Sequence, residues 1–269
     1  MKATKLKHMN QFLEWSIDYA SDKAYLDDLF KIYPTIPNAI RDIDKCVWND
    51  IEKAYLNQDD MALINHLLKL ELFPIKDSYV AYLKRDNSAI LRNPKTIRRI
   101  ASEIYDMNLK DVYEKCSQPK ETNRQIGPMF KNWIRKGTLG FDVLCLDDFL
   151  STNDDAILDA TDKEMEDFAR NNLGYKHDKG LDFLARISGR YIIGEAKFLS
   201  DFGGHQNAQF NDAISTISAK VKRGVIKIAI LDGVLYIKSN NKMYRDITTT
   251  LKDCNIMSAL LLKTFLHTI

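Results

Sequence analysis

Three charged residues stand in sequence that otherwise strongly favours buried β-strands. The stretch GLDFLARISGRYIIGEAKFL, residues 180–199, carries Asp182, Glu195 and Lys197 among long apolar runs. Charged side chains are costly to bury unless they are paired or bind a metal ion. Two carboxylates with a lysine beside them are groups that can hold a divalent cation and act on water or on a phosphate. Such chemistry requires that the fold bring the three side chains together.

A two-residue turn at Ser188-Gly189 would do so by forming a β-hairpin. In that register Asp182 falls directly opposite Glu195, and Lys197 lies on the same face two residues further along. Directly opposed side chains have Cβ atoms about 4.5–5.5 Å apart, so two carboxylates there repel each other unless positive charge lies between them. A divalent cation would resolve the conflict.

The ligands available at this position suit Mg²⁺. The carboxylates of Asp182 and Glu195, with the backbone carbonyl of Ala196, are hard oxygen ligands. Lys197 would then help to deprotonate a water molecule or stabilise developing negative charge. The alternative is an exposed strand whose charges form solvated ion pairs worth about 0–1 kcal/mol. Because the run YIIGEAKFL is apolar on both faces, it should be a central strand, which favours the metal site.

The same block resembles the catalytic signature of the PD-(D/E)XK nuclease superfamily, in which an Asp at the end of one strand precedes (D/E)xK on the next. Asp182, Glu195 and Lys197 match its three positions, and Leu181 stands where the motif's name has Pro. The resemblance covers about residues 160–237, and the block through GEAKFLSDFGGHQNAQFNDA is most similar to type II restriction endonucleases. It implies Mg²⁺-dependent, sequence-specific cleavage of double-stranded DNA that leaves a 5′-phosphate, usually by a homodimer.

The surrounding sequence predicts an α/β (α+β) fold with a mixed central sheet flanked by helices, a restriction-endonuclease-like core. A helix with a capping box at Thr161 and Glu164 should precede the hairpin and end at Gly174. A second hairpin is predicted at Asp232-Gly233. Residues 1–120 show mostly helical periodicity. We therefore expect a helical region at 1–120 for recognition or dimerisation, and a catalytic domain at 121–269.

Polar residues follow the charged strand closely. A helix is predicted from Gly203-Gly204 toward Gly224, and near its start lie four polar side chains that could contact DNA. These are His205, Gln206, Asn207 and Gln209. Amide side chains recognise adenine edges, and a helix N-terminus favours phosphate. The alternative is a polar helix start with solvated amides. Glu164 has two interpretations as well: an acid directed toward the cation, or only the third residue of its capping box.

Composition excludes several other classes of function. The net charge of +2 does not by itself predict a nucleic-acid partner. The four cysteines form no CxxC pair, which is typical of free thiols in a reducing compartment. No glycine-rich phosphate loop indicates a nucleotide cofactor, and no apolar run is long enough for a membrane span. We expect a cytoplasmic prokaryotic protein.

Two other functions remain open at this stage. One is a nuclease of DNA repair or recombination with the same core, which would act on ends, branches or mismatches. The other is a non-catalytic DNA-binding module with a nuclease-like fold, although the intact set of Asp182, Glu195 and Lys197 argues against it. The recognition sequence, the stagger of the cut and the oligomeric state are not encoded in any visible motif.

Overall fold

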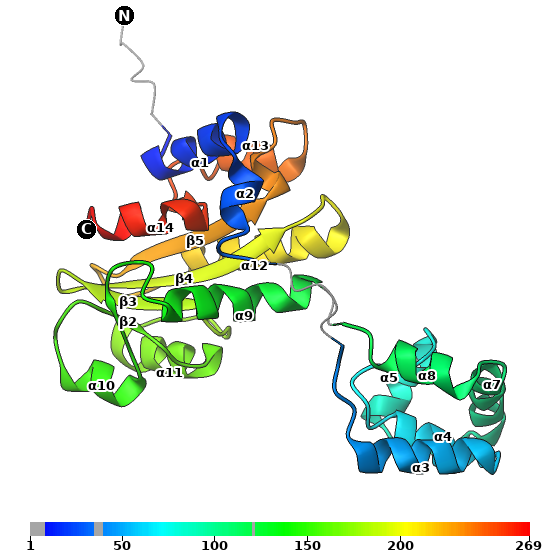
Figure 1. The fold of residues 1–269 in the computed structure, drawn as a ribbon. Coiled ribbons are helices and arrows are strands. Elements are labelled where there is room, and N and C mark those ends of the chain that lie inside the picture. The colour runs from blue at the N-terminus through cyan, green and yellow to red at the C-terminus, as the bar shows by residue number, and fades with distance from the viewer. Residues whose placement is uncertain (1–8, 35–39, 120–121) are drawn as a thin grey trace, which may run out of the picture. The chain divides into compact units, whose positions relative to one another are not determined.

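The computed structural model describes residues 9–34, 40–119 and 122–269. The chain folds into two compact units (Figure 1). One unit consists of residues 36–121. The other joins residues 1–35 with residues 122–269, so the first unit is an insertion in the second. Across the described residues, no helix is both long and apolar enough to span a membrane.

The inserted unit contains helices and no strands in its described residues. Its helices are α3 (Lys45–Leu56), α4 (Asp60–Leu67), α5 (Ser78–Arg85), α6 (Ala89–Arg92), α7 (Pro94–Tyr105) and α8 (Leu109–Cys116). Four of them begin at Asp or Asn residues whose side chains accept a hydrogen bond from a backbone N–H of the first turn, which are Asp44, Asp59, Asp77 and Asn108. The apolar faces of the helices share a core of their own.

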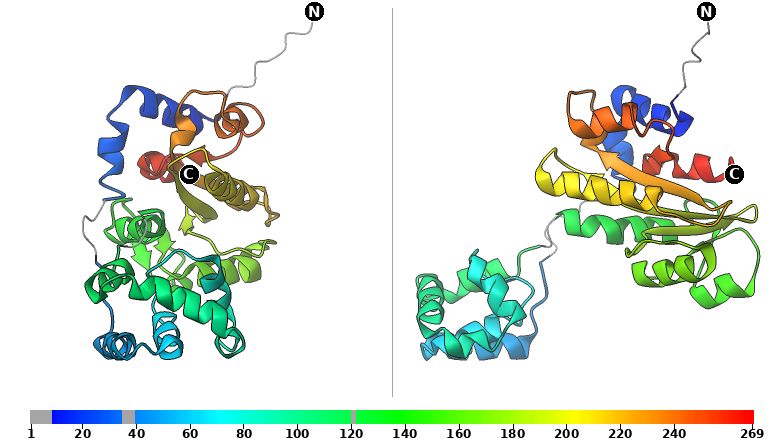
Figure 2. Two further views of the ribbon diagram at one scale, coloured as in Figure 1. Left: turned by 90° about the vertical axis from the view of Figure 1, so that its right-hand side faces the viewer. Right: turned by 180° about the vertical axis from the view of Figure 1, so that it is seen from behind.

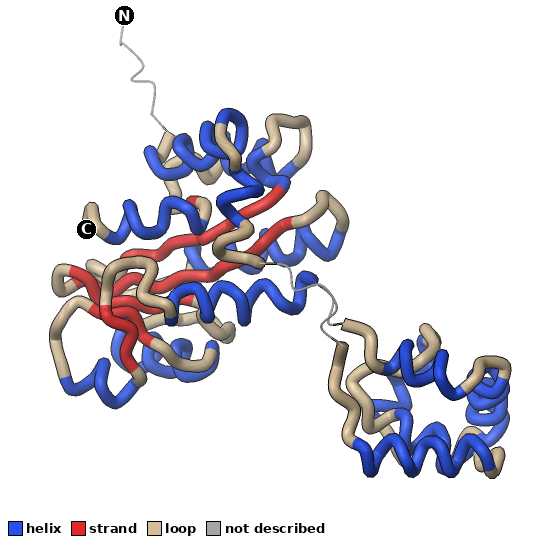
Figure 3. Tube along the Cα trace, in the orientation of Figure 1, coloured by secondary structure: helices blue, strands red, loops and turns tan. Residues whose placement is uncertain are grey.

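The larger unit contains a mixed sheet, which Figure 3 shows in red. In its described residues the strands are β1 (Asp142–Leu144), β2 (Ala156–Leu158), β3 (Phe183–Ile187), β4 (Arg190–Leu199), β5 (Ile226–Gly233) and β6 (Ile256–Met257). Their spatial order follows the chain. Strand β4 is central: it pairs with β3 in antiparallel and with β5 in parallel orientation. The predicted mixed α/β fold is therefore confirmed.

Helices cover both faces of this sheet (Figure 2). Helices α11 (Asp162–Leu173) and α12 (Gly204–Ser218) cover one face, and α1 (Gln11–Asp22), α9 (Thr122–Arg135) and α14 (Ala259–Leu266) cover the other. Shorter elements complete the unit: α2 (Tyr25–Leu29), α10 (Leu146–Ser151), the 3₁₀ turn η1 (Val234–Tyr236) and α13 (Lys242–Thr248). Helix α11 has the predicted capping box at Thr161 and Glu164 and ends at Gly174 in the left-handed conformation.

The predicted helical region at 1–120 needs correction at its start, because the described residues 9–34 belong to the sheet-containing unit. The anchor is Asp232, which is fully buried at the end of β5. Its carboxylate accepts hydrogen bonds from the hydroxyls of Tyr25, Tyr33 and Ser258, and from the backbone N–H of Ala259. A buried carboxylate requires several donors, and here they come from both ends of the chain. Helical periodicity alone could not assign these N-terminal residues to the unit that contains the sheet.

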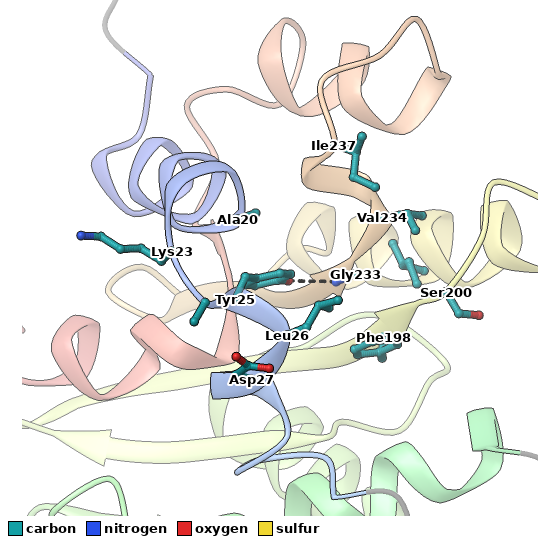
Figure 4. Close-up of a pocket in the computed structure, with 12 residues that line it drawn as sticks. Ala20, Lys23, Tyr25, Leu26, Asp27, Phe198, Ser200, Gly233, Val234 and Ile237 are labelled. Carbon is teal, nitrogen blue, oxygen red and sulfur yellow. Dashed lines mark hydrogen bonds between the residues drawn. The ribbon is translucent and has the colours of Figure 1, made fainter.

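The predicted hairpin at Asp232-Gly233 is wrong. The chain continues into η1, and β5 pairs with β4 in parallel orientation. Gly233 is required for another reason: it has φ of 104°, and a Cβ atom there would lie 2.0 Å from the carbonyl oxygen of Leu199. Its N–H donates to the Tyr25 hydroxyl (Figure 4). Helix α12 is also shorter than predicted. The chain leaves the helix at Ala219 and passes the end of α11, where the N–H of Lys222 donates to the carbonyl of Leu173.

The Asp232 network should be a main determinant of stability in the larger unit. Replacement of Asp232 by Ala leaves four donors buried without their acceptor, so we expect a loss of about 3–5 kcal/mol in the free energy of unfolding. Urea unfolding followed by circular dichroism measures it. Asp167→Ala, at an exposed acid on α11, is the control and should change stability by less than about 0.5 kcal/mol. Equal effects of the two substitutions would contradict the assignment.

The same carboxyl predicts an unusual pH dependence. Burial raises the pKa of Asp232 above its usual 3.8, although the hydrogen bonds from Ser258, Ala259 and the two tyrosines oppose the rise. The folded protein therefore binds this proton more tightly than the unfolded chain. The stability of the wild type relative to Asp232→Asn should increase as pH falls through the raised pKa toward 3.8, and level off below it. Unfolding of both proteins across acid pH tests this, and a difference that shrinks on acidification would refute it.

Candidate active site

The β3–β4 hairpin has the predicted register. Ile187 pairs with Arg190, Ala185 with Ile192, and Phe183 with Gly194. The turn is formed by Ser188 and Gly189, with φ of 49° and 70°. Positive φ at both central residues is typical of the tight turns that match the right-handed twist of paired strands. Beyond the last pair, the N–H of Asp182 still donates to the carbonyl of Gly194.

This register brings Asp182, Glu195 and Lys197 together. The Lys197 Nζ atom lies 2.8 Å from Oδ2 of Asp182 and 2.6 Å from Oε1 of Glu195. The Glu195 side chain is only 3 % exposed, whereas the other two keep modest contact with solvent. The lysine ammonium therefore lies between two carboxylates that would otherwise repel each other.

The backbone of β4 fixes these positions. Gly194 lets β4 approach β5, because a Cβ atom there would lie 2.7 Å from Cγ1 of Ile228. The N–H of Ala196 donates to Oδ2 of Asp182 at 3.0 Å. In a strand, the N–H and C=O of one residue point to the same side, so the Ala196 carbonyl also faces the side of Asp182. The β3–β4 pairing ends at Phe183, so this carbonyl lies beyond it.

The cluster perturbs its own ionisation. Burial, followed by the charge of Asp182, raises the pKa of Glu195, while Lys197 and Lys179 lower it in part. Burial also lowers the pKa of Lys197, but the attraction of Asp182 and Glu195 outweighs that effect, and its pKa is raised overall. Lys197 is thus held as an ammonium ion. It can donate hydrogen bonds to an anion or a water molecule but is a poor base in this state.

A second lysine, not anticipated from the sequence, joins the cluster. Lys179 lies in the loop before β3, with its Nζ atom 3.2 Å from Oε1 of Glu195 and 2.8 Å from Oδ2 of Asp212 on α12. The only signal in the sequence is that Lys179 precedes Asp182 by three residues. Asp212 lies on α12. The sequence predicts the apolar stripe of this helix but not its orientation over Glu195.

The donor set fits a hard divalent cation. Oε2 of Glu195 is buried without a hydrogen bond, and an ionised oxygen in that situation needs positive charge. Among the described residues, no group of three or more His, Cys, Asp and Glu side chains could hold a metal ion. A cation would therefore depend on Asp182, Glu195 and backbone oxygen, and would retain positions for water or phosphate.

Asp182 also opens toward helix α9. A hollow of about 290 Å³ is lined by Asp182 and Asp162 together with Lys131, Asn132 and Arg135 of α9. Lys131 pairs with Asp162, and Arg135 pairs with Asp159. A separate cavity of about 570 Å³ lies among α1, α2 and the ends of β4 and β5 (Figure 4). Its lining is largely apolar and includes none of Asp182, Glu195 and Lys197, whereas Asp182 does line the first hollow.

The polar residues at the start of α12 divide into two groups. Gln206 is buried, accepts from the Ser200 N–H and donates to its hydroxyl, so its amide closes the β4–α12 loop. The contact of Gln206 with DNA stays a prediction, and these hydrogen bonds give its amide a structural role. His205 and Gln209 lie nearer the surface and contact each other at 3.2 Å, and Asn207 donates to the Phe202 carbonyl.

Glu164 has the structural role that the capping box predicts. Its carboxylate accepts from the backbone N–H and the hydroxyl of Thr161, both at 2.7 Å. These hydrogen bonds lower its pKa. Within the described residues its hydrogen bonds are those of the capping box, with none to Asp182, Glu195 or Lys197, so helix capping accounts for its position.

The division at α12 can be tested through stability. Gln206→Ala should lower the free energy of unfolding by about 1–3 kcal/mol, because it leaves the Ser200 N–H without the acceptor that closes the loop. Gln209→Ala is the matched control on the same helix and should change stability by less than about 0.5 kcal/mol. Denaturant unfolding of the two variants provides the comparison. A larger loss for Gln209→Ala would reverse the assignment.

No curated protein and no solved structure matches this chain. A family model described as Tsp45I type II restriction enzyme matches residues 10–269. The match therefore includes the inserted helical unit, the β3–β4 hairpin and the segments that follow it. The chain belongs to the Tsp45I type II restriction enzyme family.

Proposed function

We propose that this type II restriction enzyme hydrolyses double-stranded DNA with Mg²⁺ at a PD-(D/E)XK site formed by Asp182, Glu195 and Lys197. The observation that carries the proposal is the Lys197 ammonium held between two carboxylates, one of which has a buried oxygen without a hydrogen bond. Asp182, Glu195 and the backbone carbonyl of Ala196 would hold the cation. When bound, Mg²⁺ supplies a Lewis acid that polarises a phosphate oxygen and activates water.

The protein's own groups have separate tasks in this scheme. The hydrogen bond from the Ala196 N–H orients the carboxylate of Asp182. The Lys197 ammonium is placed to donate to the attacking water or to a phosphate oxygen as negative charge grows there. In the hydrolysis, a water oxygen bonds to phosphorus and the bond to the 3′ oxygen breaks. That oxygen takes up a proton, which leaves a 3′-hydroxyl and a 5′-phosphate.

Contacts with the DNA backbone are proposed along the hollow beside Asp182. Its α9 side presents Lys131, Asn132 and Arg135, which are donors suited to phosphate. At the start of α12, His205, Asn207 and Gln209 remain candidates for contact with DNA. The inserted helical unit is proposed to serve recognition or dimerisation. A homodimer would supply one site for each strand.

The catalytic assignment predicts the behaviour of simple variants. Unmethylated phage DNA should give discrete fragments with Mg²⁺ and remain intact with EDTA. Asp182→Asn, Glu195→Gln and Lys197→Met should each slow cleavage at least about a thousandfold, because each removes a charge at the reacting phosphate. Binding of Lys197→Met to uncut DNA should persist. Gel analysis of timed digests, with mobility shift in Ca²⁺, measures both properties.

The control for these variants is Lys163→Met, which removes an exposed lysine of α11 that pairs with Asp167. It should cut at the wild-type rate. Cleavage by Lys197→Met near the wild-type rate would refute the role of the lysine. A smear would favour a repair or recombination nuclease, and intact DNA under every condition would favour a non-catalytic binding module. Supercoiled plasmid that becomes linear without a nicked intermediate would support a dimer that cuts both strands together.

A further inference from the structure

Lys179 joins the active site to an acid that the proposed catalytic set does not include. Its ammonium bridges Glu195, the most buried carboxylate of the cluster, and Asp212, whose side chain is 55 % exposed. We propose that Lys179 and Asp212 form a counter-charge pair that sets the affinity of the site for divalent cations. In the metal-free protein Lys179 neutralises Glu195, and when a cation binds Lys179 is held by Asp212 alone. The proposal rests on the metal site proposed above.

The loop that carries Lys179 is fixed on both sides. Arg170 of α11 donates to the carbonyl of His177 at 3.2 Å and pairs with Asp178. The ring of His177 contacts the hydroxyl of Ser215 on α12 at 3.1 Å. Two helices therefore clamp the residues immediately before Lys179, so the position of its backbone is well defined.

The other end of the loop is fixed by close packing on α11. The N–H of Leu181 donates to the carbonyl of Asp162 at 3.1 Å. A Cβ atom at Gly180 would lie 2.8 Å from Cβ of Asp162, so only glycine permits this approach. Lys179 therefore reaches Glu195 from an anchored backbone, and the contact does not depend on a freely moving surface loop.

The balance of charge in the cluster supports a shift of Lys179 from Glu195 to Asp212. The described cluster contains three carboxylates, Asp182, Glu195 and Asp212, and two ammonium groups, Lys179 and Lys197. A cation beside Glu195 would be repelled by both ammonium groups, because like charges a few ångströms apart repel each other strongly where solvent screens them weakly. Lysine has a flexible stem, so Lys179 can lengthen its contact with Glu195 while keeping that with Asp212. Asp212 thus lowers the cost of admitting the metal.

The experiment is a titration of metal-free protein with Mg²⁺ and with Mn²⁺, without DNA, followed by calorimetry. Lys179→Gln removes a competing positive charge and should tighten cation binding about tenfold. Asp212→Asn leaves Lys179 on Glu195 and should weaken binding by a similar factor. When Lys179→Gln is already present, the addition of Asp212→Asn should change the cation affinity little, because the lysine that Asp212 would hold is absent. A merely structural role for Lys179 would produce no such coupling.

Controls come from the Lys163–Asp167 pair of α11, whose atoms lie 3.0 Å apart away from the cluster. Lys163→Gln and Asp167→Asn should leave cation affinity unchanged, and circular dichroism should show that all variants are folded. Unchanged or weaker cation binding by Lys179→Gln overturns the proposal. It is also overturned if Asp212→Asn weakens cation binding as much in the double variant as it does alone. A wild type that binds neither ion overturns the proposed metal site itself. A third outcome separates the two proposals. If Glu195→Gln abolishes cation binding but Lys179→Gln does not raise the cation affinity, the proposed metal site stands and only the role of Lys179 is refuted.

Discussion

The repulsion between Asp182 and Glu195 is the constraint on which the site depends. The tight turn at Ser188 and Gly189 sets the pairing of β3 with β4, and that pairing places the two acids across from each other. The Lys197 ammonium relieves the repulsion, with its Nζ atom 2.6 Å from Oε1 of Glu195 and 2.8 Å from Oδ2 of Asp182. Burial of Glu195 makes this relief necessary, because solvent screens its charge only weakly. The hairpin thus maintains an unfavourable pair of charges that only positive charge can stabilise.

The rest of the larger unit keeps that hairpin in place. Strand β4 has neighbours on both sides, and Gly194 permits its close approach to β5. Helix α11 supports the loop before β3, and α12 covers the face on which Glu195 lies. Because side chains alternate along a strand, a one-residue slip in this pairing would move all three charged residues to the opposite face. Tight packing around β4 therefore protects the geometry of the chemistry.

Local patterns were sufficient to predict much of this arrangement. The turn, the register, the capping box at Thr161 and Glu164, and the proximity of Asp182, Glu195 and Lys197 all follow from short-range rules. Long-range contacts were not predictable in this way. Asp232 was taken for a turn residue, although it is a buried acceptor for donors about 200 residues away in the chain. The contacts of Lys179 with Glu195 and of Gln206 with Ser200 were not predicted, because they are set by how loops pack on helices.

The closure of the larger unit by Asp232 has a consequence for how the chain folds. Tyr25 and Tyr33 come early in the chain, whereas their acceptor lies on β5, and the N–H of Ser258 donates to the Ser16 hydroxyl. During synthesis the inserted helical unit has all its core residues long before the sheet-containing unit does. The early tyrosines must wait for β5 and α14 to emerge from the ribosome. The sheet-containing unit can thus complete its core only after β5 and α14 have been synthesised, later than the inserted helical unit.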